Sequence, residues 1–483
     1  MQSMQAIDET VARMWQGETL QALCDFVRIP ARSVGFDPNW EQNGFLLQAC
    51  EDAARWAKTL FPNAVFEVLS EPGRSPALFF EIPASGCSCP ESVFFYGHFD
   101  KQPEGEGWTQ GRKAFTPSVE GRRLYGRGAA DDGYNFYAAM TALAALDENG
   151  APRPRAVGLY ETAEECESVD FAYWLEKTAP RIGRVGFVSV LDGTCCDYDR
   201  LWTTVSFRGA LSFTLNVRVL QYGVHSGTAS GIVPESFTIA RALLERIEKA
   251  QTAEISAPEL NVEIPEERLA QLRHCASILG EKITGEFPWA GSVHARNPDP
   301  FASLVMRGWK PQLAVTGAEG LPALENAGNV LRAGTRLKCS MRIAPTLDPE
   351  KALEYIRREL TRDPIFGCTV TLDPAGFGPG WNAPAEKPWF TRSFDAASRE
   401  LFGKSATYCC DGASIPILSL MQRCFGDAQY LVTGVLGPGS NAHGPDEMLD
   451  LDYVSKLTSA LARIIAAIGR QDENPQAGGA HAS

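Results

Sequence analysis

Three short segments in the first half of the chain are almost entirely apolar. They are Val93–Tyr96, Ala156–Tyr160 and Val185–Leu191. Strands that are apolar on both faces are typical of the inner strands of a sheet that helices cover on both sides. Helical patterns alternate with these segments, so the order of elements predicts an α/β fold. In such folds, ligands bind beyond the carboxyl ends of the strands.

The pattern changes near Phe207. Leu211–Val219 and Arg336–Ile343 alternate apolar with polar residues, and a helical pattern lies between them at 235–249. Alternation indicates a sheet with one face toward solvent, so we expect a smaller α+β domain here.

The chain is long enough for at least two domains. We expect the smaller domain to be inserted into a discontinuous larger one, and the polar end of the chain to be disordered. The predicted parts are 1–205 with 378–470 for the larger domain, 206–377 for the inserted domain, and 471–483 for the tail.

Composition excludes several classes of protein. The chain has 59 acidic and 45 basic residues and a net charge of −14, which disfavours a nucleic-acid-binding surface. No apolar run reaches the roughly 18 residues that span a bilayer, and the first residues lack the apolar core of a signal peptide. The 13 cysteines include no Cys-x-x-Cys pair, so we expect reduced thiols in a cytoplasmic protein and no thiolate zinc site.

Acidic residues and histidines follow the apolar segments. His98 and Asp100 come directly after the first of them, and Asp192 ends the third. At the two-residue period of a strand, His98 and Asp100 project to the same side, where the carboxylate can orient the imidazole of a metal ligand. The alternative is a histidine held by a local aspartate at a strand end.

A second acidic pair, Asp131-Asp132, precedes a helical pattern that begins at Tyr134. The Gly126–Gly133 stretch begins like a phosphate loop, but an aspartate stands where a dinucleotide fingerprint needs its third glycine. A carboxylate there would repel a pyrophosphate, so we exclude nucleotide binding. The pair serves either as a helix N-cap or as a carboxylate that bridges two cations.

Further acidic residues follow the second apolar segment. Glu161, Glu164 and Glu165 repel one another in a sheltered site unless cations compensate them; the alternative is a solvated acidic loop. His443 lies in a late Gly-rich loop. One carboxylate at a strand end is ordinary, but several at one sheet edge are costly without metal, and this coincidence favours a metal site.

The order of these motifs resembles the co-catalytic zinc peptidases, a family that includes carnosine dipeptidases, peptidase V and glutamate carboxypeptidases. The resemblance implies an α/β catalytic domain with a mixed sheet and an inserted smaller α+β domain that serves as lid and dimerisation domain. The matching residues run over nearly the whole chain: Tyr-Gly-His98-Phe-Asp100, Leu-Tyr-Gly-Arg-Gly-Ala-Ala-Asp131-Asp132, Glu164-Glu165, Asp192, His443, and Gly223-Val-His225-Ser-Gly227 in the inserted domain.

Residue by residue, the resemblance implies two zinc ions bridged by Asp131, with manganese or cobalt as alternatives. One ion would also take His98 and Asp192, and the other Glu165 and His443.

The resemblance also implies catalytic roles. Asp100 would orient His98, and Glu164 would be the general base for a water that the metal ions activate. His225 would stabilise the tetrahedral oxyanion and would act in the partner's site of a homodimer joined through the inserted domain.

On the substrate side, Arg342 would bind a free carboxylate through its planar fork, with Asn329 and Ser414 as weaker candidates. The sequence departs from the family at Gly133, where a lysine is usual, and at Arg332 and Asp446. None of these departures removes a metal ligand.

The sequence therefore predicts a dizinc hydrolase that cleaves the amide bond of dipeptides or similar small substrates. The alternatives are an N-acyl-amino-acid amidohydrolase or carboxypeptidase of the same family, or, as a non-enzyme, a metal-free binding protein on the same fold. Neither nucleic acid nor membrane is an expected partner.

Overall fold

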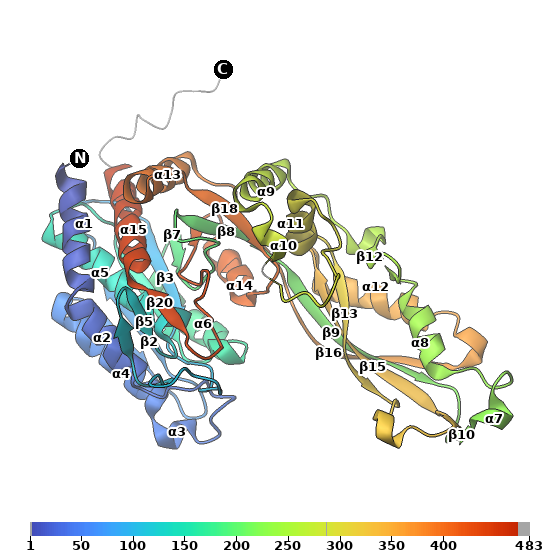
Figure 1. Cartoon of the computed structure of the whole chain (residues 1–483). Helices are drawn as coiled ribbons and strands as arrows, with labels where there is room; N and C mark the ends of the chain where they lie inside the picture. Colours follow the sequence, from blue (N-terminus) through green and yellow to red (C-terminus); the bar gives the residue numbers. More distant parts are fainter. Residues whose placement is uncertain (1, 286, 472–483) are drawn as a thin grey trace. The chain divides into compact units, whose positions relative to one another are not determined.

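The computed structural model describes residues 2–285 and 287–471, in which the chain forms two compact units (Figure 1). The second unit contains all of the segment predicted as an insertion, 206–377, and also takes 408–419. The predicted disordered tail lies outside the described residues except for Gln471. Among the described residues, the first unit comprises 2–204, 383–407 and 420–471, and the second comprises 205–285, 287–382 and 408–419.

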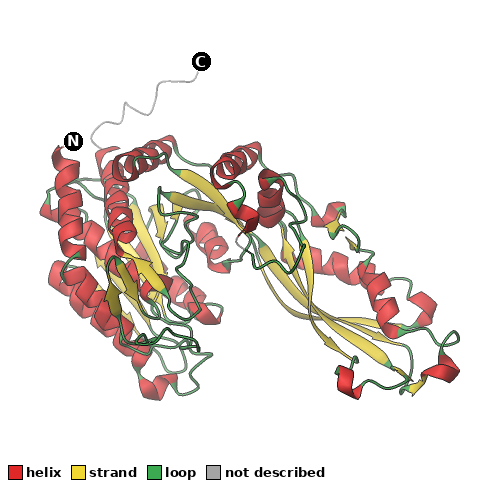
Figure 2. Ribbon diagram, in the orientation of Figure 1, coloured by secondary structure: helices red, strands yellow, loops and turns green. Residues whose placement is uncertain are grey.

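A six-stranded mixed sheet forms the centre of the first unit (Figure 2). In spatial order its strands are β1 (Val65–Leu69), β2 (Ala77–Ile82), β6 (Ala156–Glu161), β3 (Ser92–His98), β7 (Val185–Val190) and β19 (Gln429–Val432). The last four are parallel neighbours, and β1 and β2 run antiparallel at one edge. Every residue of β3 and β6 is buried, as their apolar sequences predict. The predicted mixed α/β fold is confirmed.

The first unit also contains helices. They are α1 (Gln2–Trp15), α2 (Glu18–Val27), α3 (Trp40–Asn43), α4 (Phe45–Leu60), α5 (Tyr134–Glu148), α6 (Phe171–Ile182), α13 (Pro388–Phe402) and α15 (Leu451–Gln471). α5 packs against β3, α4 against β1 and β2, and α6 against β6. A small sheet of β4 (Ser118–Glu120), β5 (Arg123–Tyr125) and β20 (Met448–Asp450) lies beside the residues that precede α5.

The second unit is built on a four-stranded antiparallel sheet. In spatial order its strands are β13 (Gln312–Glu319), β15 (Gly334–Ile343), β9 (Gly209–Arg218) and β16 (Thr369–Gly378). Alternate residues of β9 and β15 are buried, and α8 (Ser236–Leu244) and α12 (Pro349–Thr361) pack on β9. Asp348 caps α12 by accepting hydrogen bonds from the backbone N–H groups of Glu350 and Lys351.

The helix predicted at 235–249 is shorter in the structure. α8 ends at Leu244, and β11 (Glu248–Lys249) pairs with β12 (Glu254–Ile255) as a small hairpin. Ile247 packs into the core of the second unit between the two elements. Tertiary packing of this one side chain therefore overrides the helical pattern.

The remaining elements lie outside the six-stranded sheet and the four-stranded sheet. They are β8 (Trp202–Phe207), β17 (Trp381–Asn382) and β18 (Thr407–Asp411), which form a three-stranded sheet, the paired strands β10 (Val224–His225) and β14 (Val330–Leu331), and the helices α7 (Ser226–Ala229), α9 (Glu266–Leu279), α10 (Lys282–Gly285), α11 (Pro300–Trp309) and α14 (Pro416–Phe425). Two boundaries between the units fall within strands: one lies in β8, between residues 204 and 205, and the other lies in β18, between residues 407 and 408.

No disulfide joins the thirteen cysteines, all of which lie among the described residues. Within that part of the chain, no helix is both long and apolar enough to cross a membrane.

Candidate metal centre and substrate-binding residues

Polar side chains gather where three parallel strands of the first unit end. His98 is the last residue of β3 and lies opposite Glu161, the last residue of β6, while Asp192 follows the end of β7 by two residues. Because these strands are parallel neighbours, their carboxyl ends meet at one edge of the sheet. The predicted clustering of acidic residues and histidine at the strand ends is therefore present in the structure.

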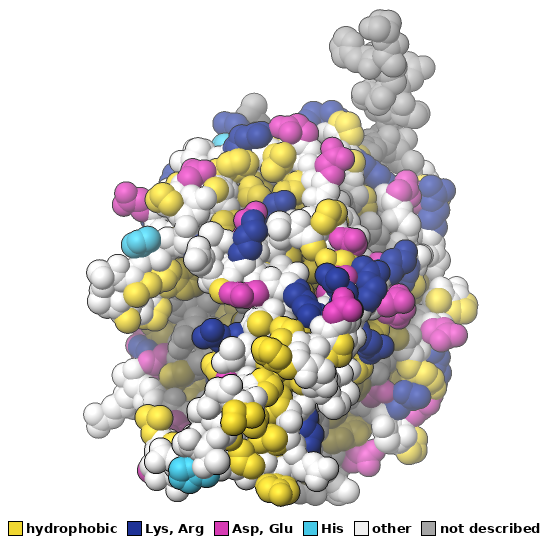
Figure 3. Space-filling view, turned by 90° about the vertical axis from the view of Figure 1, so that its right-hand side faces the viewer, with side chains coloured by type: hydrophobic (Ala, Val, Ile, Leu, Met, Phe, Trp, Pro, Cys, Tyr) yellow, Lys and Arg dark blue, Asp and Glu magenta, His cyan; other side chains and the backbone are white. Residues whose placement is uncertain are grey.

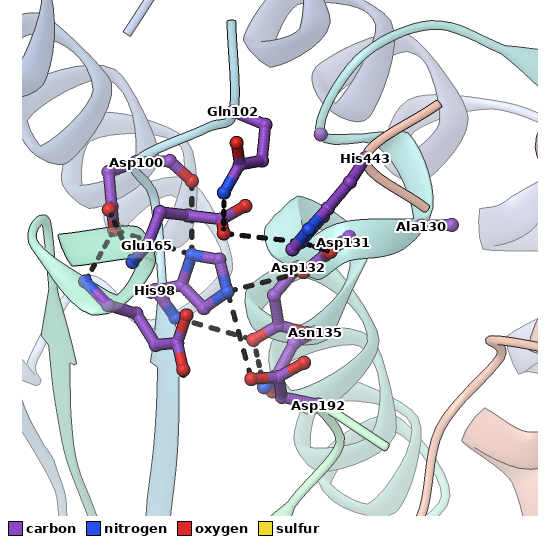
Figure 4. A network of polar contacts seen from close by, with 12 residues as sticks. His98, Asp100, Gln102, Ala130, Asp131, Asp132, Asn135, Glu165, Asp192 and His443 are labelled. Carbon is purple, nitrogen blue, oxygen red and sulfur yellow. Dashed lines mark hydrogen bonds and ion pairs between the residues drawn. The ribbon is translucent and has the colours of Figure 1, made fainter. Parts of the chain in front are cut away.

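The His98 ring lies between two sets of oxygens (Figure 4). Its Nδ1 is 3.0 Å from the backbone oxygen and 3.4 Å from the carboxylate of Asp100. On the other side, its Nε2 is 3.4 Å from Asp131 Oδ1 and 3.7 Å from Asp192 Oδ2. Burial alone would lower the pKa of His98, but its contacts with Asp100 and Asp131 raise the pKa well above the ordinary value.

The His443 ring approaches the same aspartate from the opposite side. Its Nε2 is 2.9 Å from Asp131 Oδ2 and 3.2 Å from Glu165 Oε2. These two contacts raise the pKa of His443 to about 10. Gln102 donates a hydrogen bond of 2.7 Å to Glu165, so the carboxylate is held from its other side (Figure 4). Asp131 thus stands between two imidazoles, with one carboxylate oxygen toward each.

The pKa values of the carboxyl groups in the cluster are shifted in different directions. Burial raises the pKa of Glu164 well above its ordinary value and raises that of Asp192 to about 7. Burial would also raise the pKa of Asp131, but its close contacts with the His443 and His98 rings lower the pKa below the ordinary value. Burial, and then repulsion between neighbouring carboxylates, therefore disfavours the charged forms of Glu164 and Asp192 when no cation is bound.

The donor set fits two cations. Two groups of three side chains have ligand atoms within 4.8 Å of one another: His98, Glu164 and Asp192, and Asp131, Glu165 and His443. His98 Nε2 is fully buried and has no hydrogen-bond partner, which is costly for a polar atom unless something else binds it. The first group contains Glu164, which the sequence assigned to proton transfer.

Asp100 connects the two groups through the backbone. Its carboxylate accepts hydrogen bonds from the backbone N–H groups of Glu164, at 3.2 Å, and Glu165, at 3.0 Å. The aspartate is fully buried beside the His98 ring. One side chain therefore fixes both the histidine and the turn that carries the two glutamates.

A buried ion pair that the sequence did not predict holds the loop of His443. Arg127 bonds to Glu447 at 2.8 Å and donates to the backbone oxygens of His443 and Gly444. Glu447 accepts in turn from the backbone N–H groups of Gly128, Ala130 and Asp131. The pair lies 320 residues apart in the chain, so no local pattern could have shown it.

Lys101 is a second residue whose place was not predicted. It is fully buried, and its Nζ donates to the backbone oxygens of Phe26, Val27 and Ile29. The same Phe26 packs on Gly133, where a Cβ would lie 2.1 Å from a ring carbon. The lysine that is usual in the family at position 133 therefore has no room in this chain.

Two substrate-side candidates lie together in the second unit. Arg342 donates a hydrogen bond of 2.8 Å to Ser414 Oγ, and that hydroxyl donates to the backbone oxygen of Arg208 at 2.5 Å. Burial, followed by the nearby charge of Arg342, lowers the pKa of Arg208 to about 10. A substrate carboxylate at this point would offset the repulsion between the two guanidinium groups.

The other two candidates lie at the opposite end of the same sheet. His225 pairs with Val330, and the backbone oxygen of Asn329 accepts from the N–H of Ser226. His225 and Asn329 lie near the end of the sheet where Arg218, the last residue of β9, pairs with Gly334. Arg342 lies at the other end, where it pairs with Ala210 near the start of β9. Eight residues of extended strand separate Gly334 from Arg342, a distance of roughly 26 Å. The structure does not bring His225 and Arg342 together within one chain.

Comparison with known proteins places the chain in a family. The model of peptidase family M20/M25/M40 matches residues 94–467. A cysteinylglycine-S-conjugate dipeptidase from Corynebacterium striatum is 22% identical over 429 residues, which are 87% of this chain and 90% of that protein.

Two solved structures have the same fold. Human carnosine dipeptidase 1 superposes with a TM-score of 0.70 at 20% identity, over 97% of this chain and 99% of its own. A dinuclear metal-binding peptidase of the M20 family from Bacillus subtilis superposes with a TM-score of 0.56 at 12% identity, over 95% and 99%. The resemblance drawn from the sequence motifs is confirmed: the chain belongs to peptidase family M20/M25/M40 and is an enzyme of the metallopeptidase type.

Proposed function

We propose that the chain hydrolyses the amide bond of dipeptides, or of similar small substrates with a free carboxylate, at a centre of two divalent metal ions. The observation that carries the proposal is the position of Asp131 between His98 and His443. Each histidine has a further carboxylate nearby, Asp192 for His98 and Glu165 for His443. Nitrogen and oxygen ligands without thiolate suit zinc, with manganese and cobalt as alternatives.

The two ions, when bound, supply the positive charge that acidifies a water molecule and polarises the substrate carbonyl. Glu164 accepts a proton from the attacking water and delivers it to the leaving amine. Burial raises the pKa of Glu164, so its carboxylate is a stronger proton acceptor than that of an exposed glutamate. The hydrogen bond from its backbone N–H to Asp100 keeps Glu164 beside His98 during this transfer.

Dipeptides are favoured as substrates because the Corynebacterium relative and the human neighbour are both dipeptidases by name. A library of dipeptides and N-acyl amino acids, assayed with zinc, manganese and cobalt, tests the proposal. We expect metal-dependent turnover of dipeptides that a chelator abolishes and added metal restores. Preferential turnover of N-acyl amino acids would favour the amidohydrolase alternative, and no turnover with any metal would contradict the proposal.

The thirteen cysteines, all free in the structure, support a reducing, cytoplasmic location.

Arg342 is proposed to bind the free carboxylate of the substrate. Arg342→Lys keeps the charge but loses the planar fork, so KM should rise by roughly tenfold or more. Peptides amidated at the C-terminus should be poor substrates for the same reason. Arg336→Lys is a matched control, because Arg336 lies on the same strand and bonds to Asn216 and Glu319. Equal turnover of free and amidated peptides would remove Arg342 from the site.

His225 is proposed to act in the site of a partner copy. The stretch of β15 from Gly334 to Arg342 spans roughly 26 Å, which exceeds the ~7 Å that a dipeptide spans. His225 and Arg342 of one chain therefore cannot contact one substrate. A dimer formed through the second unit would supply His225 from the other chain. Tyr222 and Ile232, 73% and 83% exposed near His225, offer apolar surface for such contacts. Hydrophobic side chains gather on the face drawn in Figure 3.

Subunit exchange between two inactive variants tests this arrangement. His225→Ala and Glu164→Gln are mixed under conditions that exchange chains. In a mixed dimer, one site carries both defects, and the other combines an intact Glu164 with an intact His225. Random exchange makes half of the dimers mixed, so roughly a quarter of all sites should recover activity. No recovery, with exchange confirmed by differently tagged chains, would show that His225 works within its own chain or not at all.

A further inference from the structure

A cavity in the second unit adjoins the residue proposed to bind the substrate carboxylate. Its volume is about 270 Å³, and Gln312 is among its lining residues. Gln312 lies directly opposite Arg342 in the pairing of β13 with β15. Side chains of directly opposed residues lie on the same face of a sheet, with Cβ atoms about 5 Å apart. A ligand group held by Arg342 is therefore within reach of the cavity.

The walls of the cavity are mostly apolar. Ile283, Phe287, Trp289 and Met306 line it. The Phe287 and Trp289 rings meet edge to face at a centroid distance of 5.7 Å, and the Trp289 indole N–H donates to the backbone oxygen of Thr284. Both rings remain exposed, at 48% and 44%. Large aromatic side chains that are half exposed beside a cavity are typical of a binding site.

Three arginines, Arg208, Arg296 and Arg307, complete the lining. Arg208 bonds to the backbone oxygens of Gly412 and Lys310, which fixes its position, and Arg307 lies near enough for its charge to act on Arg208. Guanidinium groups are attracted to the faces of aromatic rings. An aliphatic side chain would use only the apolar walls. A carboxylate would lose its hydration against these walls, while Arg208 and Arg296 already donate to backbone oxygens. An aromatic ring suits both parts of the lining.

We propose that this cavity binds the aromatic side chain of the substrate's C-terminal residue, while Arg342 binds the carboxylate of that residue. The inference rests on the proposed function and narrows its substrates to peptides that end in phenylalanine, tyrosine or tryptophan. The volume is below the roughly 300–1,000 Å³ of sites for whole drug-sized ligands, which agrees with one side chain as the occupant.

Peptide pairs that differ only in the C-terminal residue test the inference on the metal-loaded full chain. With the same N-terminal residue, we expect kcat/KM for a C-terminal phenylalanine to exceed that for alanine by roughly 10- to 100-fold, mostly through KM. The double variant Phe287→Ala/Trp289→Ala should reduce this ratio by about tenfold or more. Since both rings are half exposed, their removal leaves the core intact. Met306→Trp, which fills the cavity, should reduce the same ratio.

Phe377→Ala is the matched control. Phe377 is an aromatic residue of the same unit, 49% exposed, that does not line the cavity, so the wild-type ratio should remain. A ratio near one in the wild type, or a ratio that the double variant leaves unchanged, would overturn the inference while leaving the hydrolase proposal standing. A preference for C-terminal glutamate would overturn it as well. No turnover of any peptide would overturn both proposals.

Discussion

Glu164→Gln is expected to lower kcat by roughly 10²- to 10⁴-fold, the usual contribution of a positioned general base. The amide has nearly the shape of the carboxylate but cannot accept the proton of the attacking water. The backbone N–H of residue 164 still donates to Asp100, so the turn beside His98 should keep its place. Metal analysis of the purified variant should therefore find the same two ions as in the wild type.

Glu165→Gln is the matched control, because it makes the same chemical change one residue along the chain. Glu165 lies 3.2 Å from His443 Nε2 and accepts a hydrogen bond from Gln102. As a ligand, it should lose affinity for one ion when its charge is removed. The variants should thus differ in metal content although both lose activity. If both retained two ions, or both lost one, the roles proposed for the two glutamates would be wrong.

Arg127→Met is expected to destabilise the chain by about 3–5 kcal/mol, because it leaves the buried carboxylate of Glu447 without its cation. The pair is almost fully buried, at 1% and 0% side-chain exposure. The variant also loses the bonds that tie the loop of His443 to the Asp131 stretch, so it should bind one metal ion weakly. Urea unfolding of the metal-free protein and metal analysis measure the two effects separately.

Arg399→Met provides the comparison for that experiment. Arg399 pairs with Asp395 on α13, and the two side chains are 62% and 39% exposed. An exposed pair of this kind contributes at most about 1 kcal/mol. An equal loss of stability in the two variants would contradict the role assigned to Arg127 and Glu447.

The sequence predicted those parts of the site that depend on local pattern. An apolar strand that ends in His98, and another that ends in Asp192, must place these residues at one sheet edge once the strands are parallel neighbours. The family resemblance added the loop of His443, which periodicity alone could not place. The α+β character of the second unit followed from the change in hydrophobic period, and the mixed sheet of the first unit from the family resemblance.

The parts that were not predicted depend on long-range packing. Arg127 and Glu447 meet across 320 residues, and no sequence pattern marked Lys101 as fully buried. The separation of His225 from Arg342 follows from the antiparallel pairing of β9 with β15, and alternation alone does not show which strands pair. The hairpin after α8 forms because Ile247 packs into the core.

The central claim is a centre of two metal ions, and the metal content of active enzyme tests it most directly. Protein purified after loading with zinc is analysed for metal and for activity in the same sample. The account predicts two ions per chain, since Asp131 stands between two separate sets of ligands. His98→Ala should contain one ion fewer and lose activity. Full activity in a chain that holds one ion or none would contradict the account.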